Sequence, residues 1–142
     1  MIPYRRRLSR GFTLIEIMVV VVIIGLLAAI VMPNVIGNID TASINRARQD
    51  IRAISSALDL YRLDNFTYPT TDEGLSVLTG QGGVGETAGK RYLNSVPSDP
   101  WNNPYQYQQP GRNGEFDVFT LGADGQEGGE GINADIGSWD LN

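Results

Sequence analysis

The feature that most constrains this chain is an apolar run of 25 residues, 12–36, whose only charged side chain is Glu16. As an α-helix it would span about 37 Å at about 1.5 Å per residue, enough to cross a hydrocarbon layer about 30 Å thick. The run is preceded by no acidic residue and by four arginines: Arg5, Arg6, Arg7 and Arg10. Because basic flanks stay in the cytoplasm, the sequence predicts a single-pass membrane anchor with the C-terminal body outside.

A basic segment followed by an apolar run is also how a secretory signal peptide begins. In this chain no small-x-small cleavage pattern follows the run, and no cysteine is present to mark a lipoprotein. The membrane anchor is therefore the simpler prediction of the two.

Glu16 needs an explanation, because a carboxylate near the centre of a membrane helix costs about 2.5–3.5 kcal/mol and one in the first turns costs less. In one account, Glu16 lies shallow and reaches the cytoplasmic headgroups beside Arg10. In the other, it has a positive partner inside the apolar layer. That partner would be Arg10 in the intact chain, or a new amino terminus at Phe12 if the chain were cut after Gly11.

The rest of the chain is acidic and contains neither cysteine nor histidine. The net charge is −5, and it would be −9 without residues 1–11. No basic patch for nucleic acid is expected in such a body. Disulfides, thiol nucleophiles, histidine triads and ordinary zinc sites are excluded. A head of about 100 residues builds only a small core, so a metal ion or assembly into a polymer would have to stabilise it.

The first part of the head carries one apolar face with spacings of three and four residues, which is typical of an amphipathic helix packed on a core. This face consists of Ile44, Ala47, Ile51, Ile54, Leu58 and Tyr61. Together with the apolar run, it predicts one long helix from Phe12 to about Leu63.

Residues 103–108 and 116–121 alternate or contain aromatic and β-branched side chains, and the turn residues 110–114 separate them. This pattern predicts a β-hairpin. Two strands alone are marginal, so we expect them to pack on the helix or on a third strand. Residues 71–78 predict a short helix or turn, and the glycine-rich residues 80–89 predict a flexible loop.

The segment 121–136 is acidic and rich in glycine, and it offers oxygen donors without nitrogen or sulfur. Such donors suit Ca²⁺, which takes six to eight oxygens. In an EF-hand loop starting at Asp124, Gly129 would hold the sixth place, but Gln126 and Gly128 replace the usual donors. A β-roll repeat would begin at Gly128, but only one copy is present. An ordinary acidic loop is the remaining alternative.

Residues 11–16, GFTLIE, after a basic leader resemble the processing site of type IV pilins and pseudopilins. The resemblance implies that a prepilin peptidase cuts after Gly11 and methylates the new amino terminus at Phe12. It also implies that Glu16 neutralises the amino group of Phe12 on a neighbouring subunit as the helices bundle into a fibre.

Three further stretches, PSDPWNNPYQY from residue 97, FDVFTLGADG from residue 116 and ADIGSWD from residue 134, resemble the major pseudopilins of type II secretion systems, the protein G family. The resemblance implies an α+β, type IV pilin-like fold, in which a long N-terminal helix packs on a small antiparallel sheet. It divides the chain into a leader, 1–11, a transmembrane and assembly segment, 12–36, and a periplasmic head, 37–142.

By the same resemblance, a structural Ca²⁺ binds the C-terminal loop. The implied ligands are the carboxylates of Asp124 and Asp135, with carbonyl oxygens from Leu121 and Gln126 or from the turn of residues 128–133. Asp135 is the weaker assignment, because Asn133 and Glu130 compete with it.

The resemblance also implies a function without catalysis. The chain would be held in the bacterial inner membrane and would then polymerise into a periplasmic fibre that helps to export folded proteins. Its implied partners are further copies of itself, minor pseudopilins, the prepilin peptidase/N-methyltransferase and the inner-membrane assembly platform.

Two other functions remain as alternatives. A subunit of a surface pilus for adhesion or motility would usually close a C-terminal loop with two cysteines, which this chain lacks. A membrane-anchored enzyme would need a carboxylate pair drawn from Asp117, Asp124 and Asp135.

Overall fold

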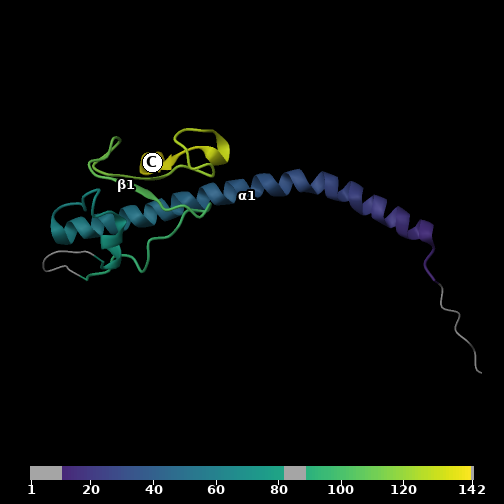
Figure 1. Ribbon diagram of the computed structural model, residues 1–142, viewed down its shortest axis with the longest axis horizontal. Helices are drawn as coiled ribbons and strands as arrows, with labels where there is room; N and C mark the ends of the chain where they lie inside the picture. Colours follow the sequence, from purple (N-terminus) through teal and green to yellow (C-terminus); the bar gives the residue numbers. More distant parts are fainter. Residues whose placement is uncertain (1–10, 82–88, 142) are drawn as a thin grey trace, which may run out of the picture. The chain divides into compact units, whose positions relative to one another are not determined.

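The computed structural model describes residues 11–81 and 89–141, with the side chains of residues 31–38 left out (Figure 1). Its elements are α1 (Leu14–Asn65), η1 (Leu75–Thr79), β1 (Gln106–Gln108), β2 (Asp117–Thr120), η2 (Gly131–Asn133), β3 (Ile136–Gly137) and η3 (Ser138–Asp140). The chain divides after Asn38 into two compact units, which are described separately. Most of the expected leader, 1–11, and of the expected flexible loop, 80–89, falls outside the described residues.

Helix α1 confirms the prediction of one long helix to within two residues at each end. In the first of the chain's two units, every large apolar side chain described between Phe12 and Ile30 is exposed. Among the residues that the structure describes, no helix is both long and apolar enough to cross a membrane. The last part of the expected span, residues 31–36, has no described side chains.

In the second unit, the predicted apolar face of α1 forms the centre of the core. Ala47, Ile51, Ile54 and Leu58 are fully buried, while Ile44 and Tyr61 pack at its edge. The side chains that cover this face come from η1, the loop before β1, and the sheet: Leu75, Val77, Leu78, Tyr105, Val118 and Ile136. Burial of this face against the sheet is what joins the helix to the rest of the head.

The sheet has three antiparallel strands in the order β1-β2-β3. The predicted hairpin is confirmed, and β3 is the third strand that two strands alone required. The strands are shorter than the segments that predicted them. Pro104, for example, makes only an isolated bridge to Ser98, since proline has no N–H to donate to a ladder.

Strand β2 lies in the middle of the sheet and makes a different contact at each residue. Asp117 pairs with Gln108 of β1 in the strand register, and the N–H of Val118 donates to Ser138 Oγ at 3.3 Å. The ring of Phe119 lies 5.7 Å from that of Trp139, and Thr120 pairs with Ile136 of β3. The C-terminal segment is therefore held to the head through β2.

The buried stripe of α1 gives a direct test of this packing. Leu58 is fully buried and Leu60, two positions along the same helix, is 52% exposed. We expect Leu58→Ala to lower the free energy of unfolding by about 2–5 kcal/mol through lost burial and the cavity it leaves. Leu60→Ala is the matched control and should change it by less than about 0.5 kcal/mol. Urea denaturation of the full chain in detergent measures both; equal losses would contradict the core described here.

Candidate functional site

The N-terminal end of α1 carries a reciprocal pair of hydrogen bonds between Thr13 and Glu16. The N–H of Thr13 donates to Glu16 Oε2 at 3.4 Å, and the N–H of Glu16 donates to Thr13 Oγ1 at 3.2 Å. This arrangement is a capping box, which satisfies N–H groups that have no partner inside the helix. Sequence reasoning missed it, although a threonine followed three residues later by a glutamate was the signal.

The residues before this helix have the form that proteolytic processing needs. Gly11, Phe12 and Thr13 lie outside regular secondary structure, and Phe12 is 76% exposed. The peptide bond between Gly11 and Phe12 is therefore accessible in the described chain. The expected pairing of Glu16 with a neighbour's amino terminus concerns a second copy, and it stays a prediction.

The acidic segment at the other end of the chain is the connection between β2 and β3. Pairing of Thr120 with Ile136 holds its two ends together, and the N–H of Ala123 donates to the carbonyl of Ile132 at 2.9 Å. Strands rather than helices flank this loop, so the EF-hand alternative does not fit its surroundings.

Two glycines let the arms of this loop approach closely. Both have positive φ, 69° at Gly122 and 88° at Gly129. A Cβ at Gly122 would lie 2.7 Å from the carbonyl carbon of Asn133, and one at Gly129 would lie 2.5 Å from its oxygen. Any larger residue at either position would push the backbone of Asn133 away.

The expected ligands sit on different parts of the loop. The strand pairing brings Leu121 and Asp135 to its two ends, and both line a hollow of about 330 Å³ together with Glu127. The carboxylate of Asp124 accepts the N–H of Gln126 at 3.1 Å on its own arm. In the described part of the chain, no three acidic side chains gather as a metal cluster.

Asp135 has an oxygen whose bonding capacity is unused. Its Oδ2 accepts the N–H of Gly128 at 2.9 Å, whereas its Oδ1 is buried and has no hydrogen-bond partner. A buried carboxylate oxygen without a donor is costly, so this atom is suited to a cation. Since no three described carboxylates cluster here, an ion at this site would need backbone carbonyls among its ligands.

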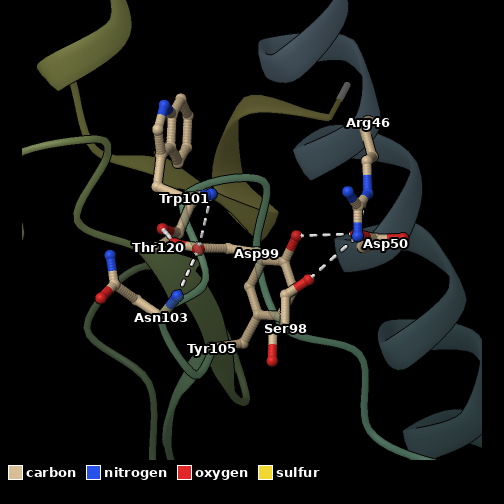
Figure 2. Close-up of polar contacts among 8 residues, drawn as sticks. All are labelled: Arg46, Asp50, Ser98, Asp99, Trp101, Asn103, Tyr105 and Thr120. Carbon is tan, nitrogen blue, oxygen red and sulfur yellow. Dashed lines mark hydrogen bonds and ion pairs between the residues drawn. The ribbon is translucent and has the colours of Figure 1, made fainter.

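A buried carboxylate that sequence reasoning left without a role, Asp99, fixes the start of this loop. Figure 2 shows it between the segment before β1 and the end of β2. Its Oδ1 accepts the N–H groups of Trp101 at 3.0 Å and Asn103 at 2.7 Å, and its Oδ2 accepts the hydroxyl of Thr120 at 2.5 Å. The Asp-Pro pair at 99 and 100, which is typical of turn initiation, was the signal for it.

The same segment is tied to α1 by a second polar group (Figure 2). The hydroxyl of Tyr105 donates to Asp50 Oδ2 at 3.0 Å, and Arg46 lies 3.7 Å from that oxygen and donates to the carbonyl of Ser98. Burial, and then the charge of Asp50, raises the pKa of Tyr105 well above its ordinary value. The phenol therefore keeps its proton and remains a donor to the helix.

Asp117 serves the hairpin in a similar way. It is 2% exposed, and its Oδ2 accepts the N–H groups of Arg112 at 2.7 Å and Asn113 at 3.2 Å. The three carboxylates of the enzyme alternative, those of Asp117, Asp124 and Asp135, thus all accept backbone hydrogen bonds. Such bonds stabilise the backbone conformation of turns and loops.

Comparisons with known proteins find matches to both the head and the N-terminal segment of the chain. Residues 34–139 match the family model described as type II secretion system protein G, and residues 6–32 match the prokaryotic N-terminal methylation motif. The chain is 54% identical to the type II secretion system core protein G of Pseudomonas aeruginosa over 140 residues, which cover 96% of this chain and 99% of that one. It is 53% identical to the protein of that name from Vibrio cholerae, with 96% of each chain covered.

A solved structure is similar as well. The crystal structure of the major pseudopilin from the type 2 secretion system of enterohaemorrhagic Escherichia coli superposes with a TM-score of 0.64 at 39% identity. The match covers 77% of this chain and 96% of the other. The expected α+β fold, a long helix packed on a small antiparallel sheet, is confirmed.

The hydrogen bonds that Asp99 accepts can be tested by removing its carboxylate. Asp99→Ala would leave the buried hydroxyl of Thr120 and the part-buried N–H groups of Trp101 and Asn103 without their acceptor, and a buried donor left in this way costs about 1–3 kcal/mol. We expect the free energy of unfolding of the full chain to fall by about 2–4 kcal/mol, measured by urea denaturation with tryptophan fluorescence. The control is Asp72→Ala at an exposed position, which should have an effect below about 0.5 kcal/mol. A similarly small effect of Asp99→Ala would refute its role as an anchor.

Proposed function

This chain belongs to the type II secretion system protein G family, and we propose that it is the structural subunit that polymerises into a periplasmic pseudopilus and so drives the export of folded proteins across the outer membrane. The observation that carries the proposal is the joint match of the head to protein G and of the N-terminal segment to the methylation motif. A fibre subunit needs both parts, a head and a processed apolar helix.

The first half of α1 supplies the assembly surface in this proposal. All of its residues from Leu14 to Ile30 are exposed, and all except Glu16 are apolar. A helix that is apolar all round must be covered by lipid or by other helices. We infer that lipid of the inner membrane covers it before assembly, with the head in the periplasm, and that neighbouring copies cover it in the fibre.

Processing connects these two states. A prepilin peptidase/N-methyltransferase cuts after Gly11, which is accessible ahead of the capped helix, and methylates Phe12. The new amino group carries a positive charge at the end of α1 where the helix dipole is also positive. A carboxylate at Glu16 of an adjacent copy neutralises that charge as the helices bundle, with the assembly platform and minor pseudopilins as partners.

A structural Ca²⁺ in the β2–β3 loop is part of the proposal. The loop offers only hard oxygen donors, and the partnerless Oδ1 of Asp135 supports a cation there. The ion would be held by the carboxylates of Asp124 and Asp135 and by the carbonyl oxygens of Leu121 and Gln126. When bound, it stabilises the folded loop by linkage.

The charge of Glu16 can be separated from its capping role. Glu16→Gln keeps the capping box, because glutamine also serves at this position, but it removes the charge. We expect this variant to be inserted and processed normally and to lose at least tenfold in fibre yield, measured by shearing and sedimentation. Thr13→Val, the control, weakens the cap and keeps the charge, so it should still form fibres. Wild-type fibre yield from Glu16→Gln would eliminate the proposed charge pairing.

The ion site is tested by thermal unfolding of the full chain with excess Ca²⁺ and then with EGTA. At a free Ca²⁺ concentration 100-fold above Kd, one site adds about 2.7 kcal/mol, so we expect Tm to be higher with Ca²⁺ by roughly 10 °C. Asp135→Asn and Asp124→Ala should both lower Tm in Ca²⁺ and abolish the effect of EGTA, whereas Asp72→Ala should keep it. A wild-type chain whose Tm ignores EGTA would rule the site out.

A further inference from the structure

The C-terminal end of α1 displays three large apolar side chains to solvent: Leu60, Leu63 and Phe66. They are 52%, 73% and 87% exposed, respectively. Leu60 and Leu63 are three positions apart and so lie on one face of the helix. Leu63 and Phe66 both line an open hollow of about 560 Å³. These three residues are called the helix-end patch.

The backbone of Phe66 is in a strained conformation. Its N–H donates to the carbonyl of Arg62 at 2.7 Å, and its φ of 62° is in the left-handed region. This is the position after a helix where glycine is usual, because a side chain is strained there. An aromatic residue that is both strained and almost fully exposed points to a role outside the isolated chain.

The charged groups beside the patch are already occupied within the chain. Arg62 pairs with Glu115 at 2.5 Å, and its guanidinium lies over the ring of Tyr68. Asp59 accepts the hydroxyl of Tyr68 at 2.9 Å. Asp64 pairs with Lys90, whose hydrogen bond is the main reason that the pKa of this carboxyl is lowered. The neighbouring charged groups thus all have partners within the chain, and the patch offers a partner an apolar contact.

We propose that the helix-end patch docks on the head of a second copy of this chain in the fibre. The three side chains expose on the order of 350 Å² of apolar area, well below the roughly 800 Å² per partner that a stable free complex buries. A contact of this size does not hold a free partner. It does contribute when the two copies are already tethered, because their effective concentration is then in the millimolar range.

The contact has a direction. If the patch met the same patch on the neighbour, it would close a two-fold dimer, whereas a fibre needs a contact between two different surfaces. The patch therefore packs on another surface of the adjacent head. This inference rests on the proposed polymer, whose bundled helices provide the tether.

The experiment uses the full chain together with its processing machinery. Phe66→Gly removes the aromatic ring and relieves the left-handed strain, so Tm should stay the same or rise while the fibre yield falls at least fivefold. Leu63→Gln keeps a good helix former and should likewise lower the yield without lowering Tm. Thr67→Ala, at an exposed neighbouring residue, is the control and should change neither. A wild-type yield from both patch variants, or a loss of yield that parallels a fall in Tm, would overturn the docking contact.

A photo-crosslinker identifies the occupant directly. With p-benzoylphenylalanine in place of Phe66, we expect crosslinks to a second copy of this chain in assembled fibres. Crosslinks to lipid or to a different protein would refute the proposal. If the unsubstituted chain forms no fibres, the proposed function fails. If it forms them and Phe66→Gly forms them equally well, only the docking contact fails.

Discussion

The head depends on the burial of one helical stripe against a very small sheet. Strands of three, four and two residues have too few hydrogen bonds and too little apolar surface to persist alone. The stripe from Ala47 to Leu58 supplies the surface that they lack. Asp99 then fixes the approach of the chain, because its carboxylate joins the segment before β1 to the end of β2. Apolar burial stabilises the head, and the buried carboxylate sets which parts meet.

The sequence predicted those parts of the fold whose side chains follow a recognisable local pattern. The stripe of α1 was predicted because its apolar residues recur with the spacing of a helix. The hairpin was predicted because two segments that alternate or carry aromatic and β-branched side chains lie on either side of turn residues. The capping box at Thr13 and Glu16 had a recognisable spacing and was still missed, since the apolar run suggested a membrane role first. The Asp-Pro pair at 99 and 100 indicated a turn, but the bond from Thr120 to Asp99 could not be predicted, because the two residues are 21 positions apart and no local pattern links them.

For the β2–β3 loop, the sequence predicted the kind of ligand atoms but not how those atoms are arranged in space. Its composition indicated oxygen donors, and the protein G resemblance placed them on Asp124 and Asp135. The structure adds that these carboxylates belong to different arms, each bonded to a backbone N–H, and that Asp135 keeps one buried oxygen without a donor. Such details follow from the closure of the β2–β3 connection, where Gly122 and Gly129 let the backbone approach Asn133. Close backbone contacts of this kind have no signature in composition.

Strand β2 has a consequence for how the head moves. Each of its four residues makes a separate contact. Asp117 accepts hydrogen bonds from the hairpin turn, and Val118 bonds to Ser138. Phe119 packs beside Trp139, and Thr120 bonds to Asp99. No neighbour can detach without disturbing the strand that holds the others. The hairpin, the acidic loop and the C-terminal segment therefore form one cooperative unit, and the backbone amides of β2 exchange their hydrogens with solvent only when the whole head opens. A head built in this way opens as a single body rather than element by element.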